Sequence, residues 1–587
     1  MSGQDDEREF VVSCSLALVV ATLALVPASA GASTTTTPKN TEPCAGADGV
    51  GGAVPSGLGP GDLIGAVDLT GASEKSPGFP AGARVWRILY VSTGIDESDL
   101  QLVCGLVAAP SSGPKSFAGS GRMIAWSHGT IGLAQDCLPS SDPATFFWAK
   151  TAGGIGAVAW GSLLGKHEGR TQDGILQHAM NQGWVVAATD YQPNDTYVVG
   201  KIAAGNVLDS ARAASQLMAE EFASAPVAAY NLLTWGHSQG GHAALWAGQL
   251  AQGYLSGTQP SHPTAELTLV GVALEAPASN FTVDPARQPG VARGEGLADW
   301  EMHQTISPLG IPLAPFEVQI GPALFGYIFG SWSELSNSGT PAPGALFPAY
   351  PSAAAPLDVA AIATPEGAAT IKTVQPLCLA GAGAKAIKKA TAPYRNAAAH
   401  RMLVPDLWNL PAQYRAGQYF HGGLDQTCAT TTQPGLAQWC DWVRWNQPGP
   451  LGVNPFPKAP LTDGQPVPIL IAQGGDDTII HCVAADQGSA SVVPGADDCM
   501  SRALYDSLAS EVYCPAGANH GHLELDVFRK IRLRSPASHF SIPGQIAARG
   551  QSKSASDLRF KGSSVERFIT GAFEHTLTPG CSNTIAN

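Results

Sequence analysis

The chain has 587 residues, 44% of them hydrophobic and 14% charged, with a formal net charge of −14. This length exceeds one typical domain and predicts either two domains or one domain with a large insertion. The composition is that of a globular protein with a large core rather than a disordered chain. An acidic balance without a Lys/Arg-rich run argues against nucleic-acid partners and against electrostatic docking to anionic membranes.

Residues 1–30 predict an export signal. The apolar run Val11–Val26 is shorter than the ~20 residues that a membrane span needs. It is followed at 28–30 by Ala-Ser-Ala, a small-x-small cleavage site. Arg8 is the only basic residue before this run, so either the signal is unusual or the start codon is misplaced. Because no other apolar run reaches spanning length, we predict a soluble, exported protein without an integral membrane span.

The cysteines agree with export. Of eleven cysteines, Cys14 lies inside the signal, which leaves ten in the mature chain. An even, scattered set without a C-x-x-C motif predicts disulfides in an oxidising compartment rather than a metal site. The residues alone do not fix which cysteines pair.

Strand-like and helix-like segments alternate in the first half of the chain. The strand-like ones are 84–92, 101–109, 122–127, 184–189, 231–235 and 267–275, and the helix-like ones include 174–182 and 207–220. Several of the strands are near-continuous apolar runs, which suits a sheet buried on both faces. This alternation predicts the α/β class, with a mostly parallel sheet flanked by helices.

This rhythm stops after residue 280 and resumes with strand-like segments at 467–472 and 511–513. The interval is rich in Pro, Ala and Gly and has helical patches at 371–391 and 412–419. A block that interrupts a sheet and lets it resume predicts an inserted, largely helical cap domain. The predicted parts are a signal peptide (1–30), an N-terminal arm (31–62), a first core part (63–280), the cap (281–465) and a second core part (466–587).

A Gly-x-Ser-x-Gly motif centred on Ser238 follows the strand-like segment 231–235 and precedes a helix-like segment at 241–251. Between a strand and a helix, this motif is typical of a nucleophile elbow, a tight turn that exposes a serine hydroxyl. The turn needs small neighbours, which Gly236 and Gly240 provide. In a chain with 67 glycines the motif alone also fits a structural Gly-rich turn. The flanking segments favour the elbow, with Ser238 as candidate nucleophile.

An activated serine needs a histidine base and an acid that orients it, in the chain order serine, acid, histidine for this fold class. Asp476 and Asp477 follow the strand-like segment 467–472. His520 and His522 follow the strand-like segment 511–513. Because the carboxyl ends of parallel strands share one sheet edge, these groups are expected beside Ser238. The residues alone leave both pairs of neighbours open.

The chain resembles the secretory lipases of the Candida antarctica lipase A type, which are α/β-hydrolases with a helical cap. Beyond the elbow, the similar segments are 60–64, 87–93, 126–132, 190–191, 207–214 and 473–480. The resemblance spans roughly residues 58–525. It implies an exported carboxylic-ester hydrolase that acts on acylglycerols or other acyl esters.

The resemblance also selects individual residues. The family pattern Gly-x-x-Asp-Thr-hydrophobic selects Asp477 over Asp476 as the acid. A Gly-Ala-x-His pattern selects His520 over His522 as the base. The resemblance further implies a disulfide between Cys137 and Cys378 that links the core to the cap.

Ester hydrolysis also needs donors for the oxyanion that develops in the transition state. One expected donor is the backbone N–H of Gln239, directly after the nucleophile. The other is expected in the loop Ser127–Thr130, with Gly129 and Thr130 as the candidates. The alternative interpretation of this loop is a plain tight turn.

The apolar stretch 306–332 either lines an acyl tunnel or forms the core of the cap, and Leu324, Phe325 and Ile328 are its candidate substrate-binding residues. We expect no cofactor or metal, because the sequence has no P-loop, dinucleotide fingerprint or metal-ligand cluster. Two alternatives to a lipase remain open. One is an esterase for aryl or polyester substrates, and the other is a catalytically dead hydrolase fold that binds a ligand. The sequence does not fix the oligomeric state.

Overall fold

The computed structural model describes residues 44, 53–70, 82–95, 99–141, 175–192, 197–257, 260–282, 321–337, 357–379, 381–392, 402, 428, 430–477, 479–480, 482–483, 498–528, 530–532, 535–536, 539 and 564–586. The predicted signal peptide (1–30), the helical patch 412–419 and residues 306–320 lie outside this part of the chain. Within it, no helix combines the length and the apolar character needed to cross a membrane.

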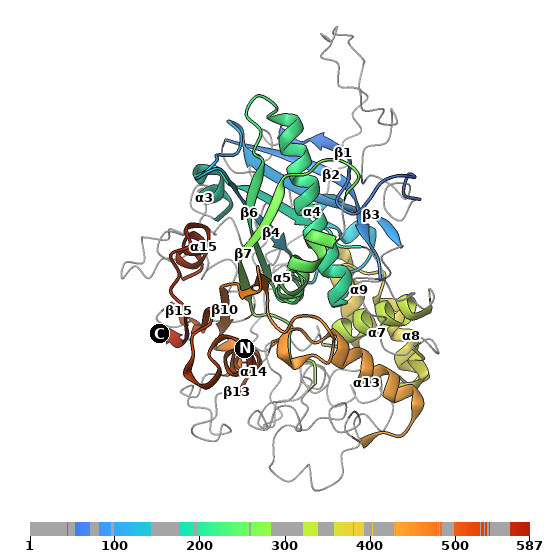
Figure 1. The fold of residues 1–587 in the computed structure, drawn as a ribbon. Coiled ribbons are helices and arrows are strands. Elements are labelled where there is room, and N and C mark those ends of the chain that lie inside the picture. The colour runs from blue at the N-terminus through green and yellow to red at the C-terminus, as the bar shows by residue number, and fades with distance from the viewer. Residues whose placement is uncertain are drawn as a thin grey trace, which may run out of the picture. The chain divides into compact units, whose positions relative to one another are not determined.

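The centre of the fold is a ten-stranded sheet in the order β1-β2-β3-β5-β4-β6-β7-β10-β14-β17 (Figure 1). Its strands are β1 (Leu63–Asp68), β2 (Ala83–Thr93), β3 (Leu100–Pro110), β4 (Gly121–Ser127), β5 (Val185–Thr189), β6 (Ala229–His237), β7 (Glu266–Glu275), β10 (Ile469–Gly474), β14 (His522–Phe528) and β17 (Gly580–Ala586). The pairings from β1 to β5 are antiparallel. Those from β5 to β17 are parallel. The predicted mostly parallel α/β sheet is confirmed.

The apolar runs of the central strands are explained by burial on both faces. In β5, Val185 and Ala187 belong to the core on one face of the sheet, and Val186 and Ala188 belong to the core on the other. Side chains alternate between the two faces of a strand, so a strand covered on both sides carries apolar residues at every position.

Helices cover both faces of the sheet (Figure 1). On one face lie α4 (Gly200–Glu221), α5 (Gln239–Gly257) and α14 (Met500–Leu508), whose Leu208, Leu245 and Leu504 share one core. On the other face lie α3 (Ile175–Gln182) and α15 (Ser564–Glu574), which contribute Leu176 and Phe568 to a second core.

Between β7 and β10 the described helices are α7 (Gly321–Asn337), α8 (Pro365–Val374), α9 (Gly381–Ala390) and α13 (Pro434–Asn446). The helical interruption of the sheet was predicted, but the continuous helical patch 371–391 is wrong, because α8 and α9 are separate. Pro376 explains the break. Proline has no N–H for the helix ladder, and its ring clashes with the carbonyl four residues earlier, so the helix ends before it.

The predicted strand 511–513 is also wrong. Residues Ala509–Tyr513 form a π-helical turn that continues α14, and the backbone N–H of Cys514 donates to the carbonyl of Ala509. Leu504, Leu508 and Val512 recur at helical spacing and pack on the same core. The strand of this region is β14, which begins at His522.

Shorter strands form small sheets beside the central one. They are β8 (Leu461–Thr462), β9 (Gln465–Pro466), β11 (Asp476–Asp477), β12 (Cys482–Val483), β13 (Asp498–Cys499), β15 (Lys530–Arg532) and β16 (Ser535–Pro536). The small sheet β11-β12-β13 holds the backbone of Asp476 and Asp477 just beyond the carboxyl end of β10.

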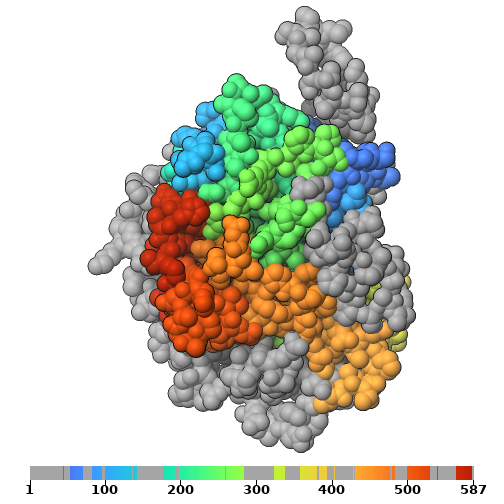
Figure 2. Space-filling model, in the orientation of Figure 1, coloured from blue at the N-terminus to red at the C-terminus, as the bar shows by residue number. Residues whose placement is uncertain are grey.

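The end of α13 and the residues after it pack on α5. The rings of Trp246 and Trp445 stack with centroids 5.9 Å apart. The carbonyl of Asn446 accepts hydrogen bonds from Trp246 Nε1 and His242 Nε2. In the space-filling view the orange residues of this segment adjoin the green residues of α5 (Figure 2). This contact joins the chain that follows the helical interruption to the helix of the elbow.

All ten cysteines outside the predicted signal form disulfides, as the sequence predicts. The pairs are Cys44–Cys104, Cys137–Cys378, Cys428–Cys440, Cys482–Cys499 and Cys514–Cys581. The Cys137–Cys378 pair implied by the resemblance is therefore confirmed. It ties the segment after β4 to the segment after α8.

Candidate active site

Ser238 lies at the turn between β6 and α5, with a φ of 57°. A positive φ is strained for a residue with a side chain and is characteristic of functional turns. Two glycines make the turn possible. A Cβ on Gly236 would stand 2.1 Å from the carbonyl oxygen of Gly240, and a Cβ on Gly240 would stand 1.9 Å from that of Ser127. The local geometry is therefore that of the predicted nucleophile elbow.

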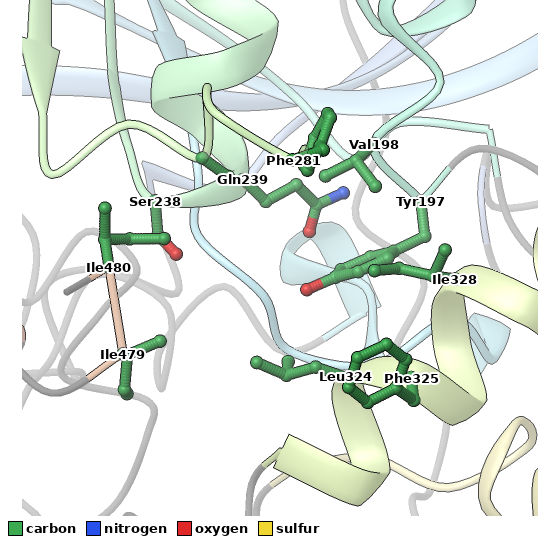
Figure 3. Close-up of a pocket in the computed structure, with 11 residues that line it drawn as sticks. Tyr197, Val198, Ser238, Gln239, Phe281, Leu324, Phe325, Ile328, Ile479 and Ile480 are labelled. Carbon is green, nitrogen blue, oxygen red and sulfur yellow. The ribbon is translucent and has the colours of Figure 1, made fainter. Parts of the chain in front are cut away.

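The side chain of Ser238 borders a pocket with mostly apolar walls. Its other lining residues are Tyr197, Val198, Gln239, Ala278, Phe281, Leu324, Phe325, Ile328, Ile479 and Ile480. The Ser238 hydroxyl points into the space between Ile480 and Tyr197, and Leu324 and Phe325 face this space from α7 (Figure 3). The three predicted substrate-binding residues thus line the same pocket as the predicted nucleophile.

Asp477 is fully buried just beyond the carboxyl end of β10. Its Oδ1 accepts the backbone N–H groups of Ile479 and Ile480, each at 2.9 Å. Its Oδ2 accepts Gln473 Nε2 at 2.8 Å and His539 Nδ1 at 2.9 Å. Four donors therefore fix the carboxylate in one orientation. The side chain of the alternative acid, Asp476, lies outside the described residues.

The structure pairs Asp477 with His539 and not with the predicted His520, which corrects the sequence prediction. His520 is exposed, and its backbone N–H donates to the carbonyl of Tyr513. It precedes β14, whereas Asp477 follows β10, and these two strands run parallel. At ~3.3 Å per residue, the seven residues of β14 place His520 roughly 20 Å from the edge that holds Asp477.

The alternative base, His522, has other partners. Its Nδ1 contacts the carbonyl of Thr578, and its Nε2 contacts Glu524 at 3.3 Å. His522 opens β14, so it lies at the same edge of the sheet as His520. The assignment of the base was wrong because residues 511–513 were taken as the strand. This placed His520 and His522 at the carboxyl edge of the sheet, whereas both lie at the start of β14.

His539 follows β14 and is 2% exposed. Its backbone carbonyl accepts His237 Nε2 at 3.1 Å, and the two imidazole rings lie 4.5 Å apart. Because His237 immediately precedes Ser238, this contact places His539 beside the elbow. His539 was not predicted from the sequence, although the sequence holds a signal for it. It follows the alternating segment His-Leu-Glu-Leu-Asp-Val-Phe at 522–528, which is typical of a strand.

The loop Ser127–Thr130 follows β4 and lies against the elbow, since a Cβ on Gly240 would meet the carbonyls of Ser127 and His128. The Tyr191 hydroxyl donates to the carbonyl of His128 at 3.1 Å. Tyr191 itself has a φ of 60° and a buried side chain. The strained, buried Tyr191 therefore holds the predicted oxyanion loop through its hydrogen bond to the His128 carbonyl.

A second contact acts on the next carbonyl of this loop. Burial lowers the pKa of His128 to about 4, so near neutral pH its ring carries one N–H. Its Nδ1 lies 2.7 Å from the carbonyl of Gly129, while its Nε2 lies 3.4 Å from the carbonyl of Asp190, which assigns the proton to Nδ1. In a trans peptide the carbonyl and the next N–H point in opposite directions. Anchoring the carbonyls of His128 and Gly129 therefore fixes the directions of the Gly129 and Thr130 N–H groups.

Gln239 is the first residue of α5. The first N–H groups of a helix have no acceptor within the helix, and the helix dipole favours negative charge at this end. The backbone N–H of Gln239 is therefore a suitable donor to an oxyanion formed at Ser238.

Glu275 ends β7 beneath the elbow, and its carbonyl accepts the backbone N–H of Ser238 at 2.8 Å. Its carboxyl group is buried, and the side chain of Trp235 is the polar group near it that lowers its pKa against the effect of burial. Burial raises the pKa of this carboxyl to about 8, so the group is mainly protonated at neutral pH.

In the described ranges no group of three or more His, Cys, Asp and Glu side chains is arranged to hold a metal ion.

Comparisons with solved structures find matches at low sequence identity. The X-ray structure of Candida antarctica lipase A is 13% identical, covers 90% of this chain and 85% of that chain, and has a TM-score of 0.49. The rice cell wall degrading esterase LipA from Xanthomonas oryzae is 14% identical, with coverages of 88% and 98% and a TM-score of 0.44. A putative hydrolase from Legionella pneumophila is 14% identical, with coverages of 82% and 94% and a TM-score of 0.45.

No curated protein matches the chain in sequence. A family model does match: residues 169–287 fit the model described as Secretory lipase. This segment includes β5, α4, β6, the elbow, α5 and β7. The match supports a hydrolase of ester substrates, and it confirms the resemblance to secretory lipases that the sequence motifs indicate.

Proposed function

We propose that the protein is an exported serine hydrolase of acyl esters, with Ser238 as nucleophile, His539 as base and Asp477 as the acid that orients the base. One observation carries this proposal. Ile479 and Ile480 line the pocket onto which Ser238 opens, and their N–H groups hold the carboxylate that binds His539. The nucleophile and the acid–base pair therefore belong to one site.

In the acylation step, His539 Nε2 accepts the proton of the Ser238 hydroxyl as the serine oxygen attacks the ester carbonyl. The Nδ1–H of His539 remains hydrogen-bonded to the Asp477 carboxylate, and the negative charge of this carboxylate stabilises the imidazolium that forms. The carbonyl electrons move to the oxyanion, which the N–H of Gln239 and one from Gly129 or Thr130 stabilise. The tetrahedral intermediate then expels the alcohol, which takes its proton from His539 and leaves an acyl-enzyme.

In the second step a water molecule attacks the acyl carbon while His539 accepts a water proton. Collapse of the second tetrahedral intermediate breaks the bond to Ser238, and its oxygen regains a proton from His539. The products are one carboxylic acid and one alcohol for each ester and water consumed.

The pocket favours an acyl chain over a polar group as its occupant. Leu324, Phe325 and Ile328 of α7 and the two isoleucines that follow Asp477 form apolar walls around the Ser238 hydroxyl (Figure 3). Each buried methylene contributes ~0.8 kcal/mol to binding. This pocket therefore supports acylglycerols or related acyl esters as substrates, and we propose that residues 281–465 act as the cap over it.

Export is part of the proposal. Five disulfides are typical of a protein that folds in an oxidising compartment. The apolar run and cleavage site within residues 1–30 supply a matching signal peptide. N-terminal sequencing of exported protein tests this assignment, and cleavage after Ala30 is the expected result.

The decisive experiment for the mechanism is Ser238→Ala, with Ser256→Ala as the matched control. Ser256 lies on the same helix and is exposed, and its hydroxyl contacts the carbonyls of Gln252 and Gly253. We expect Ser238→Ala to abolish p-nitrophenyl ester hydrolysis and fluorophosphonate labelling without a change in the circular dichroism spectrum. Ser256→Ala should behave as the parent. Hydrolysis or labelling that survives in Ser238→Ala would refute the mechanism.

A further inference from the structure

His237 is a buried histidine that contacts the residue proposed as the base. It is fully buried, and its Nε2 contacts the backbone carbonyl of His539 at 3.1 Å. A carbonyl can only accept a hydrogen bond, so Nε2 carries the proton and Nδ1 carries a lone pair. That Nδ1 has no hydrogen-bond partner among the described residues.

The contact is well placed to orient the base. Asp477 binds the imidazole of His539 through Nδ1, at the end of the side chain. His237 binds the same residue through its backbone carbonyl. A ring bond alone leaves the backbone free to shift and the ring free to swing about Asp477. Contacts at both the ring and the backbone of His539 restrict the positions that its Nε2 atom can take.

His237 also remains neutral beside the base. Burial, and then the neighbouring His539, lower the pKa of His237 well below its usual range. With the two rings 4.5 Å apart, a charged His237 would oppose the imidazolium that the proposed mechanism forms on His539. A neutral imidazole supplies the N–H donor without that repulsion.

We propose that His237, the residue before the nucleophile, is a positioning residue that holds His539 in place beside Ser238 through the carbonyl of His539. This inference rests on the proposed function. It gives the first variable position of the elbow motif a role that the sequence analysis did not assign. Through it, the strand that carries the nucleophile also sets the position of the base.

The test compares His237→Gln with His237→Leu. The side-chain amide of glutamine carries an N–H donor at about the reach of the imidazole Nε2, and leucine has none. Because a displacement of ~1 Å in a catalytic group lowers turnover about 10²-fold, we expect about that loss of kcat in His237→Leu. KM should change little, since His237 does not line the pocket. His237→Gln should recover most of the loss.

His242 provides a matched control. It is equally buried, its Nε2 contacts a backbone carbonyl at 2.9 Å, and its Nδ1 also has no partner among the described residues. That carbonyl belongs to Asn446, outside the proposed machinery. His242→Leu should therefore lower the melting temperature without the loss of kcat per folded enzyme that His237→Leu shows. Equal kcat in His237→Leu and the parent, or equal kcat losses in the two leucine variants, would overturn the inference.

If His237→Leu does not fold, His237→Asn takes its place, because its shorter side chain keeps an amide but does not reach the carbonyl of His539. Its kcat should then fall below that of His237→Gln, and equal kcat values would count against the inference. Failure of the proposed function is recognised separately. It requires activity in Ser238→Ala or His539→Ala, whereas failure of this inference alone leaves both of those variants inactive.

Discussion

The two halves of the candidate site are held by different forces. On the nucleophile side, β4, β6 and α5 approach so closely that only glycine fits at Gly236 and Gly240. On the acid–base side, Asp477 and His539 come from segments 62 residues apart and are held by hydrogen bonds between buried polar groups. Close backbone packing that leaves no room for a Cβ fixes the nucleophile side. Directed hydrogen bonds to the Asp477 carboxylate fix the acid–base side.

This difference predicts different responses to mutation. Backbone atoms around the elbow cannot move aside without disturbing the central sheet, so added volume there should destabilise the fold. Loss of a donor on the acid–base side leaves the packing largely intact, so it should lower the rate more than the stability.

The largest expected effect concerns the identity of the base. His539→Ala should lower kcat by ~10⁴-fold or more, as loss of a triad member does. Steady-state hydrolysis of p-nitrophenyl esters measures kcat, and the enzyme concentration is corrected for the fraction of the protein that is folded.

His520→Ala is the control for the base, because this exposed histidine lies at the opposite edge of the sheet from Asp477. Its kcat should stay within about twofold of the parent value, as for surface substitutions in general. The reverse ranking of the two alanine variants would restore His520 as the base.

The next effect belongs to the elbow. In Gly240→Ala the new Cβ meets the backbone carbonyls of Ser127 and His128, neither of which is the end of a flexible side chain. We expect a loss of several kcal/mol in the free energy of unfolding, as for severe overpacking. Denaturant unfolding of the variant, followed by circular dichroism, checks this.

Gly253 on the same helix provides the matched control. A Cβ there would meet nothing within 4 Å. Gly253→Ala should therefore raise stability by about 0.5–1 kcal/mol, because alanine is the better helix former. Similar losses in both alanine variants would show that the elbow is not set by the close approach of backbones.

The nucleophile side of the site could be predicted from local sequence patterns, whereas the acid–base side could be predicted only in part. The elbow, its two glycines and the helix after it occupy adjacent positions in the chain, so local patterns were enough to identify Ser238. Leu324, Phe325 and Ile328 were also found as one apolar segment. Asp476 and Asp477 were placed at this edge because they follow an apolar strand, and the family pattern then selected Asp477.

The proposed base, His539, was not predicted because its place depends on topology. His539 reaches Asp477 only because β14, and not residues 511–513, is the strand that follows β10 in the sheet. Residues 509–513 continue α14 through a π-helical turn, a choice made by packing against the core rather than by residue type. Two further contacts join segments that are distant in the sequence, Tyr191 with His128 and His237 with His539. No local sequence pattern predicts them.

A smaller effect tests the pocket. If acyl chains lie against α7, kcat/KM should rise from acetyl to medium-chain p-nitrophenyl esters. Four more buried methylenes are worth about 3 kcal/mol, or roughly a hundredfold, if the gain persists in the transition state. Phe325→Asp places a charge in this wall and should flatten the rise while acetyl ester activity survives. A parent enzyme that prefers acetyl esters would favour the alternative of an esterase for non-lipid substrates.

The smallest effect is a pH dependence of stability beneath the elbow. Burial raises the pKa of Glu275 from 4.5 to about 8, so between these values the folded protein holds a proton that the unfolded chain has released. The unfolded state then binds fewer protons, and stability falls as pH rises, by at most ~1.4 kcal/mol per pH unit. Below 4.5 both states are protonated, and above 8 the full loss is reached.

Glu275→Gln removes this titration while keeping a similar shape, so it isolates the contribution of Glu275 from those of the other buried carboxyls. The melting temperature of the variant relative to the parent should be constant below pH 4.5, rise steadily toward pH 8 and level off above it. Thermal unfolding of both proteins across that range measures the difference. Parallel curves for the two proteins would mean that the carboxyl of Glu275 has a compensating partner or reaches solvent. In that case the elbow would rest on an ionised group instead of a neutral one.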